Sequence, residues 1–210
     1  LRARSDGSSG FVNFTVANGF TNLGAIELTS AGFSASFAVT NGTLVNAPGA
    51  TITSLVEAGG TRTLTAAVDN QGLMTIAQAM SWGRTGAVHT NSGTIAVSGG
   101  NLDLNQGGGG LTNTGTITIG AGRALTTTGT AFTNSAGAIT GTGTLAFASA
   151  TATFTNAFSN ATLDLTLNSS TVNGPGTLTN AAGRTLALFN TTINAPLVNA
   201  GTLIANAGAT

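Results

Sequence analysis

The sequence predicts an all-β fold, a right-handed, single-stranded parallel β-helix, and three observations lead to this prediction. An asparagine recurs at spacings of 24, 24, 21, 22, 21, 22, 24 and 19 residues along the 210-residue chain. Short segments around each asparagine alternate apolar and polar residues, as strands with one buried face do. Gly, Asn, Ser and Thr, which favour turns, separate the segments. A period near 22 residues is typical of a solenoid coil, and parallel crossovers are usually right-handed.

The recurring asparagines predict a structural ladder, with one member in each of about nine coils of 19–24 residues. They are Asn22, Asn46, Asn70, Asn91, Asn113, Asn134, Asn156, Asn180 and Asn199. Asparagine suits a turn because it tolerates the left-handed backbone region. Stacked side-chain amides can also bond to one another from coil to coil. We therefore expect the nine side chains to line one corner of the coil.

Three short strands are expected in each coil. The residue two places before the asparagine is apolar in eight coils and is His89 in the other: Phe20, Leu44, Val68, His89, Leu111, Phe132, Phe154, Leu178 and Leu197. A second column follows the asparagine: Ile26, Ile52, Met74, Ile95, Ile117, Ile139, Leu163, Leu186 and Leu203. A third, less regular segment lies between them, for example at Phe37, Leu64, Leu102, Leu125, Leu145, Val172 and Ile193. Each column must pack on itself along the rod, because one coil cannot bury its own apolar face.

The repeat divides the chain into two parts. Residues 1–19 depart from the period and are expected to form an irregular N-terminal segment or a capping strand, with alternation in Phe11–Val16. Residues 20–210 are expected to form one β-helix that is open at its C-terminal end. Open ends expose strand edges, which promote association. End-to-end self-association is therefore one expected interaction.

Composition excludes several partners. Charged residues make up 6% of the chain, the net charge is zero, and all six basic residues are scattered arginines. Without a basic patch, binding to a nucleic-acid backbone lacks its main driving force. No apolar run reaches the roughly 18–20 residues that a membrane span requires. The chain has no cysteine, so disulfides and Cys-ligated metals are excluded. We expect no cofactor and no metal.

The coils resemble the passenger regions of bacterial autotransporters and of filamentous-haemagglutinin-like exported adhesins. The resemblance rests on segments such as Leu111–Ile119, with its Asn-Thr-Gly-Thr-Ile core, and Gly176–Leu188. It extends from about Phe20 to the end of the chain. It implies a secreted or surface-displayed right-handed β-helix that serves as a stalk or adhesive fibre, located outside the cell or on the bacterial surface. No family site residue is carried over, and the chain has no Arg-Gly-Asp motif.

Many β-helices cleave polysaccharides with several carboxylates in one column, so we compared the positions of the acids. Glu27 and Asp164 fall at similar offsets from their asparagines but six coils apart. Glu57 and Asp103 nearly align but lie two coils apart. Such pairs are too distant to cooperate, and the sequence favours a protein that is not an enzyme. A polysaccharide-active enzyme remains a third alternative.

His89 is unusual because it replaces an apolar residue, and Asp69 lies one coil before it. An imidazole next to a carboxylate can act as a general base. The alternative is a bulge that turns Val88 inward and His89 outward. We favour the bulge, because no nucleophile occupies a matching position.

Trp82 and Arg84 form the main cluster of bulky amphipathic side chains, with two methionines nearby. An indole beside a guanidinium can stack on a sugar or anchor a protein interface. The indole can equally cover a loop, and that interpretation is favoured. If the chain binds a surface glycan or a protein receptor, these two residues are the best candidates.

Two glycine-rich segments and the threonines suggest weaker alternatives. Gly99–Gly107 resembles a calcium-binding nonapeptide, but the motif occurs once and its Asp is misplaced. Gly107–Gly110 lack the lysine of a phosphate loop. Threonine pairs flank the isoleucine column fully in two coils, at Thr51 with Thr53 and Thr116 with Thr118, which favours strand propensity over ice binding.

The sequence therefore predicts a non-catalytic extracellular stalk or adhesin fragment. The main alternative is a subunit of a self-assembling extracellular filament. An ice-binding solenoid is a further alternative beside the polysaccharide-active enzyme.

Overall fold

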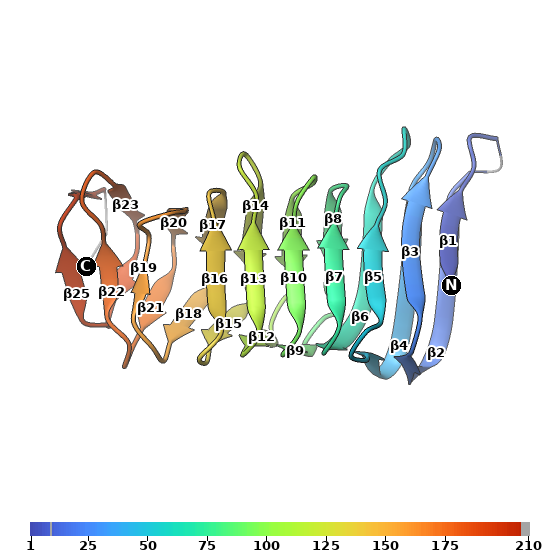
Figure 1. The fold of residues 1–210 in the computed structure, drawn as a ribbon, viewed down its shortest axis with the longest axis horizontal. Coiled ribbons are helices and arrows are strands. Elements are labelled where there is room, and N and C mark those ends of the chain that lie inside the picture. Colours follow the sequence, from blue (N-terminus) through green and yellow to red (C-terminus); the bar gives the residue numbers. More distant parts are fainter. Residues whose placement is uncertain (9, 207–210) are drawn as a thin grey trace.

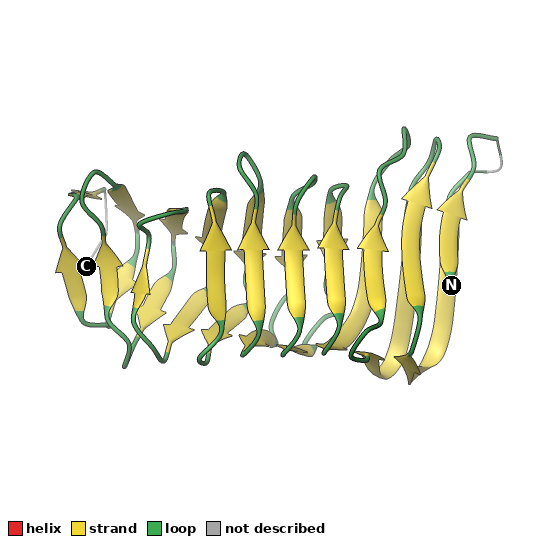
Figure 2. Ribbon diagram, viewed as in Figure 1, coloured by secondary structure: helices red, strands yellow, loops and turns green. Residues whose placement is uncertain are grey.

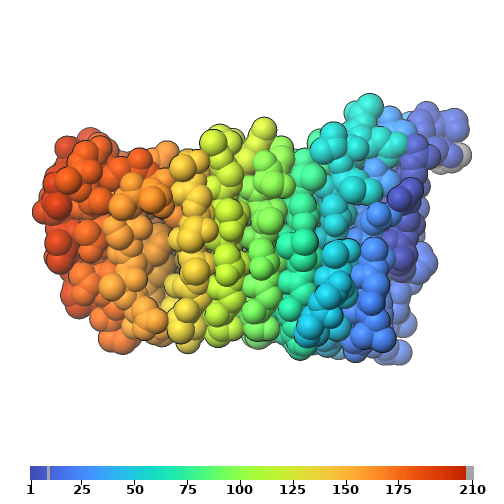
Figure 3. Space-filling view, in the orientation of Figure 1, coloured from blue at the N-terminus to red at the C-terminus, as the bar shows by residue number. Residues whose placement is uncertain are grey.

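The computed structural model describes residues 1–8 and 10–206, which wind into a parallel β-solenoid of about nine coils. The described residues form strands and turns and include no helix (Figure 2). In Figure 1 the chain rises along the near strands, crosses to the far side above and returns below while it advances from the N-terminus to the C-terminus. The winding is thus right-handed. The space-filling view shows an elongated body in which the coils follow one another in chain order (Figure 3).

The near side of the rod in Figure 1, which we call the front face, is a parallel sheet of seven strands. These are β1 (Arg2–Ser5), β3 (Ala25–Ser30), β5 (Thr51–Ser54), β7 (Leu73–Ile76), β10 (Thr94–Val97), β13 (Thr116–Ile119) and β16 (Ala138–Gly141). The front face then continues as a separate sheet of three strands. These are β19 (Phe158–Ser159), β22 (Leu178–Asn180) and β25 (Leu197–Asn199).

The other two sides of the rod belong to one parallel sheet of sixteen strands. The strands that follow the front face, on the second side, are β8 (Met80–Trp82), β11 (Leu102–Asn105), β14 (Ala124–Thr128), β17 (Thr144–Ala148), β20 (Asp164–Asn168), β23 (Thr185–Phe189) and β26 (Thr202–Ala205). Those on the third side are β9 (Val88–Asn91), β12 (Gly110–Asn113), β15 (Ala131–Asn134), β18 (Thr151–Phe154), β21 (Thr171–Asn173) and β24 (Thr192–Ile193).

In the first coils the second and third sides run as single long strands. These are β2 (Val12–Asn22), β4 (Ala35–Asn46) and β6 (Arg62–Asn70). Register shifts between Asn18 and Phe20, and between Ala38 and Thr43, mark where these strands turn the corner. Such irregularities let a strand bend without ending its pairing.

Residues 1–19, expected to be an irregular segment or a capping strand, supply β1 and most of β2. Both strands pair in register with the next coil, β1 with β3 and β2 with β4. The alternation expected in Phe11–Val16 falls within β2, which begins at Val12. The first coil is therefore built like the others. The last four residues of the expected span 20–210 lie outside the described residues.

The predicted column of aliphatic side chains is confirmed along the first seven front strands. Ile95, Ile117 and Ile139 occupy equivalent positions of neighbouring strands. The column extends back through Met74 and Ile52 to Ile26. Its members up to Ile117 are buried, and Ile139 is partly buried. Stacking of like side chains from coil to coil thus builds a core that runs along the rod.

Six of the nine asparagines form the predicted amide ladder. The side-chain nitrogen of each donates to the side-chain oxygen of the next, at 2.9 Å from Asn22 to Asn46 and at 2.7 Å for the four following steps to Asn134. Asn46, Asn70, Asn91 and Asn113 are fully buried. Burial is tolerated because each amide has a partner above and below it. The ladder therefore holds the corner between the third side and the front face.

The glycine that follows each ladder asparagine allows this corner to stack closely. A Cβ at Gly115 would lie 2.2 Å from the carbonyl oxygen of Gly93, its counterpart in the preceding coil. A Cβ at Gly137 would lie 2.1 Å from the Asn113 side-chain nitrogen. Only glycine fits such an approach. The recurring Asn-x-Gly pattern is thus one packing unit.

The ladder prediction is wrong at Asn156, which is exposed. Phe154 pairs with Asn134 and occupies the next ladder position, where its ring is fully buried. A second ladder then runs from Asn160 to Asn180 at 2.9 Å and from Asn180 to Asn199 at 2.8 Å. It lies at the corner between the front face and the second side, because β19 and β22 are front strands. The asparagines thus move by one corner.

The same shift corrects two predicted columns. Phe132 stacks on Ala152 rather than Phe154, while Leu178 stacks on Phe158 and Leu197 in the front face. Strands that follow the later asparagines, β20, β23 and β26, continue the second side from β17. Leu163, Leu186 and Leu203 are therefore not continuations of the Ile139 column. We call the segment between β16 and β19 the junction.

Candidate functional site

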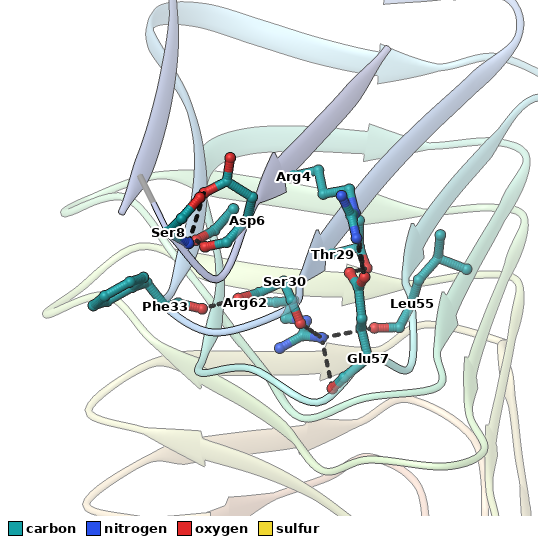
Figure 4. Close-up of polar contacts among 10 residues, drawn as sticks. Arg4, Asp6, Ser8, Thr29, Ser30, Phe33, Leu55, Glu57 and Arg62 are labelled. Atoms are coloured by element: carbon teal, nitrogen blue, oxygen red, sulfur yellow. Dashed lines mark hydrogen bonds and ion pairs between the residues drawn. The ribbon is translucent and has the colours of Figure 1, made fainter. Parts of the chain in front are cut away.

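Polar side chains that could carry chemistry gather in two places, a charged cluster in the first coils and a buried cluster around His89. Figure 4 shows the first of these, where the loop after β5 lies against β1 and β3. Glu57 Oε1 accepts hydrogen bonds from Arg4, at 2.5 Å from Nη2, and Glu57 Oε2 accepts one from the Thr29 hydroxyl at 2.6 Å. The hydrogen bond from Arg4, then that from Thr29, lowers the pKa of the Glu57 carboxyl. This carboxylate is therefore ionised and already engaged.

Arg62 lies at the centre of this cluster and is fully buried. Its guanidinium donates to the backbone carbonyls of Leu55 at 3.1 Å, Glu57 at 3.2 Å and Gly59 at 2.5 Å. It also donates to the carbonyls of Ser30 and Gly60. Burial lowers the pKa of the Arg62 guanidinium, and Glu57 opposes that effect. The side chain thus clamps the loop of residues 55–60 onto the core.

The sequence analysis missed Arg62 as a special residue, although a signal was present. Arg62 and Leu64 alternate with threonines, so the arginine occupies an inward position of the strand. A cation at such a position must satisfy its donors within the protein. Five backbone carbonyls do so here, leaving Nε without a partner. The cluster is organised as a structural clamp rather than a reactive site.

The second cluster surrounds His89, whose ring is fully buried on β9 between the positions of Val68 and Leu111. Its Nδ1 accepts a hydrogen bond from the Val68 backbone nitrogen at 3.1 Å. Its Nε2 bonds the side-chain oxygen of Gln106, and Gln106 donates to the Ala87 carbonyl at 2.9 Å. The Trp82 ring centroid lies 4.4 Å from that of His89. Burial lowers the pKa of His89 to about 4.

Both interpretations of His89 from the sequence are wrong. The expected bulge would have turned Val88 inward, yet Val88 is 65% exposed and His89 is buried. The expected partner Asp69 points outward, where its oxygens accept from Thr90 at 2.5 Å and Gln71 at 2.6 Å. The strand keeps its alternation because both ring nitrogens find partners inside. His89 and Asp69 thus lie on opposite faces of their sheet.

The surface role considered for Trp82 is also excluded, because its indole is fully buried. Trp82 is the inward residue of β8 and pairs with Leu64 and Leu104. It therefore belongs to the core rather than covering a loop. Arg84 donates to the backbone carbonyls of Val39 at 2.9 Å and Thr40 at 3.1 Å. The two residues do not form an exposed recognition site.

The four carboxylates considered for catalysis lie in separate environments. Glu27 projects from β3 on the front face and pairs with Arg2 at 2.5 Å. Asp164 projects from β20 on the second side and pairs with Arg184 at 3.0 Å. These two acids, expected to share a column, are on different sides of the rod. Glu57 lies in a loop and Asp103 on β11, so they do not align either.

The segment Gly99–Gly107, considered as a calcium site, forms a turn followed by β11. Asp103 is exposed there, and partial desolvation raises the pKa of its carboxyl. Within residues 1–8 and 10–206, no three His, Asp or Glu side chains are grouped as a metal would require. Gly107, Gly108 and Gly109 have positive φ angles, which suits a tight corner.

Threonines form outward columns on two sides of the rod. On the third side Thr90, Thr112, Thr133 and Thr153 stack in consecutive coils, a column that the sequence analysis did not identify. On the front face the pairs at Thr51 with Thr53 and Thr116 with Thr118 are separated by coils carrying Leu73 or Ala96. Thr118 and Thr140 lie within 3.4 Å of each other through their hydroxyls. These rows suit strand propensity and rung-to-rung packing.

Comparison with known proteins adds no family to this description. No protein-family model, no curated protein and no solved structure matches the chain. A search of the described part of the chain for helices long and apolar enough to cross a membrane finds none.

Proposed function

We propose that this chain is a non-catalytic, rod-like stalk of a bacterial exported surface protein. The observation that supports the proposal best is the stacking of equivalent residues along the rod, in two amide ladders and in apolar columns. Each coil is held by its neighbours on both sides, so the whole length resists bending. The resemblance of the coils to exported passenger regions supports a location on the cell surface.

The polar groups support a structural rather than a catalytic role. Glu27, Glu57 and Asp164 each pair with an arginine, and they lie on different parts of the rod. The His89 imidazole is enclosed in the core, with both nitrogens engaged. General acid–base catalysis needs such groups within reach of one substrate. The side chains that carry chemistry here instead hold strands and loops together.

A distance measurement between spin labels tests the rod directly. Asn13 and Ala187 belong to one outward column that passes through Ser81, and the chain has no native cysteine to interfere. At about 4.8 Å per coil, labels at Asn13→Cys and Ala187→Cys should lie roughly 38 Å apart, and labels at Ser81→Cys and Ala187→Cys roughly 24 Å apart. Two narrow distance distributions would support a rod. A broad distribution for either pair would contradict it.

Surface display separates a spacer from an adhesin. Bacteria would carry the chain on an outer-membrane anchor, with cells carrying the anchor alone as the control. A spacer should give no gain in binding to immobilised glycans or matrix proteins. Gain of binding would contradict the spacer and support the adhesive alternative, with an outward face as the contact surface because Trp82 is buried.

A filament subunit is the second candidate, and apolar exposure at both described ends favours it. Phe14 in β2 is 42% exposed, while Leu203 and Ile204 in β26 are 38% and 44% exposed. These end strands are parallel, so a second copy could extend the sheet by edge pairing. Sedimentation velocity over a wide concentration range, with electron microscopy, tests this candidate. Fibres would support it, and a monomer at the highest concentration would exclude it for this chain.

A further inference from the structure

The hydrogen bonds around His89 define a single protonation state for the ring. The Val68 backbone nitrogen can only donate, so Nδ1 must accept and carry no proton. The Ala87 carbonyl can only accept, so the Gln106 amide nitrogen faces it and the amide oxygen faces Nε2. Nε2 must then carry the proton. The neutral ring therefore links β6, through Val68, to the loop of Gln106.

We propose that this arrangement, the His89 lock, is an acid-sensitive joint of the rod: protonation of the buried ring breaks it and opens the corner formed by residues 83–87 and 106–109. We define the lock by the His89 ring, the Gln106 side chain and the backbone groups of Val68 and Ala87. The proposal concerns a property of the fold and is independent of the proposed function.

Protonation at Nδ1 conflicts directly with the lock. The added N–H would face the Val68 N–H, so two donors would meet where a donor now meets an acceptor. A buried cation without a new partner is also strongly unfavourable. The ring can relieve both problems by leaving its pocket, and that movement removes the acceptor–donor link to Gln106. Gln106 then no longer holds its loop to Ala87.

The charged groups around the ring give a proton no compensation. Arg84, in the loop after β8, is the charged group that acts on the ring, and it disfavours a second cation. Asp69 on β6 points to the opposite face and bonds Thr90 and Gln71. The ring's other neighbours are the Trp82 indole on β8, Gln106, and Leu111 on β12. The surroundings are therefore apolar or cationic toward His89.

The corner is built so that it can open without disturbing the rest of the rod. Gly107, Gly108 and Gly109 follow Gln106 directly, and glycine segments gain the most backbone freedom on opening. Their backbone ties are few, from Gly108 to the Gly129 carbonyl and from Gly110 to the Ala87 carbonyl. Gly83 lies so close to the Gln106 segment that a Cβ there would be 2.7 Å from the Asn105 oxygen. Release of Gln106 would thus loosen both loops together.

The direction of the pH effect follows from the lowered pKa. In the open or unfolded state His89 titrates near its ordinary value of 6.5, and in the closed state it titrates at about 4. Between these values the open state binds more protons than the closed state, so the stability of the closed lock falls as the pH falls. The equilibrium constant for opening should rise up to tenfold per pH unit across this range and level off below it.

Two spectroscopic signals of the wild-type chain test the proposal, because it holds one histidine and one tryptophan. NMR of the imidazole should show a closed state that stays neutral well below pH 6.5. Trp82 emission should shift to the red and weaken as the pH falls from 7 to 4, because the indole then loses its buried neighbour. An imidazole that titrates near pH 6.5 while Trp82 emission stays constant would overturn the proposal.

The matched variant is His89→Leu, which continues the column of Val68 and Leu111 with an apolar side chain. This variant should lose the emission change between pH 7 and 4, and hydrogen exchange of residues 106–110 should no longer accelerate in acid. The same emission change in the variant and the wild type would assign it to general acid unfolding and overturn the lock. The wild-type NMR titration decides the question if the variant does not fold.

Discussion

The seven front strands up to β16 and the three from β19 onward use the same sequence motif in different places. In the first region the asparagines lie between the third side and the front face, and six of them bond in series. In the second region three asparagines lie between the front face and the second side. The difference teaches that an amide ladder needs only equivalent corners in neighbouring coils. Which corner it occupies is decided by packing.

The junction shows how the two regions are joined. The front face is not continuous there, since β16 pairs with β13 and no described strand pairs with its other edge. Figure 1 shows a wider interval between β16 and β19 than between the other neighbouring front strands. Phe154 and Phe158 stack at the junction with centroids 4.5 Å apart. An aromatic pair thus replaces the ladder at this one place.

Removal of the Phe154 ring should have the largest effect on the comparison. The ring is buried and contacts Phe132, Phe147 and Phe158. Phe154→Ala should lower the free energy of unfolding by about 3–5 kcal/mol, because it leaves a cavity where the two regions meet. Urea unfolding followed by circular dichroism measures the change. Phe189→Ala, at a half-exposed ring, is the control, and an equal loss in both variants would contradict a role for the junction.

A pair of isoleucine variants compares the front face inside and beside the junction. Ile117 is fully buried between two paired strands, whereas Ile139 on β16 is partly buried. Ile117→Ala should cost about 2–4 kcal/mol and Ile139→Ala about half of that, since less surface leaves water at β16. Urea midpoints of the two variants provide the measurement. Equal midpoints would mean that β16 is as well covered as β13.

A pair of asparagine variants tests the corrected ladder. Asn91→Ala would remove bonds at 2.7 Å to Asn70 and Asn113 and leave their buried groups without partners. The expected loss is about 2–3 kcal/mol. Asn156→Ala, at an exposed position that the sequence placed in the ladder, should change the unfolding free energy by less than about 0.5 kcal/mol. A large loss for Asn156→Ala would restore the original prediction.

The smallest effect is expected at the ion pair of the second region. Asp164 and Arg184 are 3.0 Å apart, but the Asp164 side chain is 69% exposed. Asp164→Asn should therefore cost less than about 1 kcal/mol, and the cost should disappear in 1 M salt. Thermal unfolding at low and high salt checks this expectation. A loss that persists in high salt would indicate that the pair does more than attract across water.

Sequence reasoning predicted the first region well because its spacing and alternation agree. Ile95, Ile117 and Ile139 align both by their distance from an asparagine and by their place in a strand. The prediction failed after Asn134, where two signals compete. Asn156 continues the spacing, but Phe154 takes the ladder position in a coil of 20 residues, as its pairing with Asn134 shows. Burial of a phenyl ring contributes about 1.5–3 kcal/mol, more than the 0.5–1.5 kcal/mol net of one hydrogen bond, and so packing prevails.

The buried polar residues were missed for a different reason. Strict alternation placed His89, Trp82 and Arg62 inward, yet polarity argued for the surface. The alternation was correct, because Gln106 and backbone groups satisfy most of the polar atoms of these three side chains. Such partners come from loops distant in the sequence, and spacing alone does not reveal them. Alternation is thus the stronger signal in a solenoid strand.

The change of corner at the junction also limits how such a chain can grow by gene duplication. A coil copied within the first region, for example from Asn91 to Asn113, would present its amide to both neighbours and insert as one more rung. A copy that spans the junction would carry asparagines for two different corners, and one of them would face a side chain with no amide. Repeat number in this architecture should therefore vary on either side of the junction and stay constant across it.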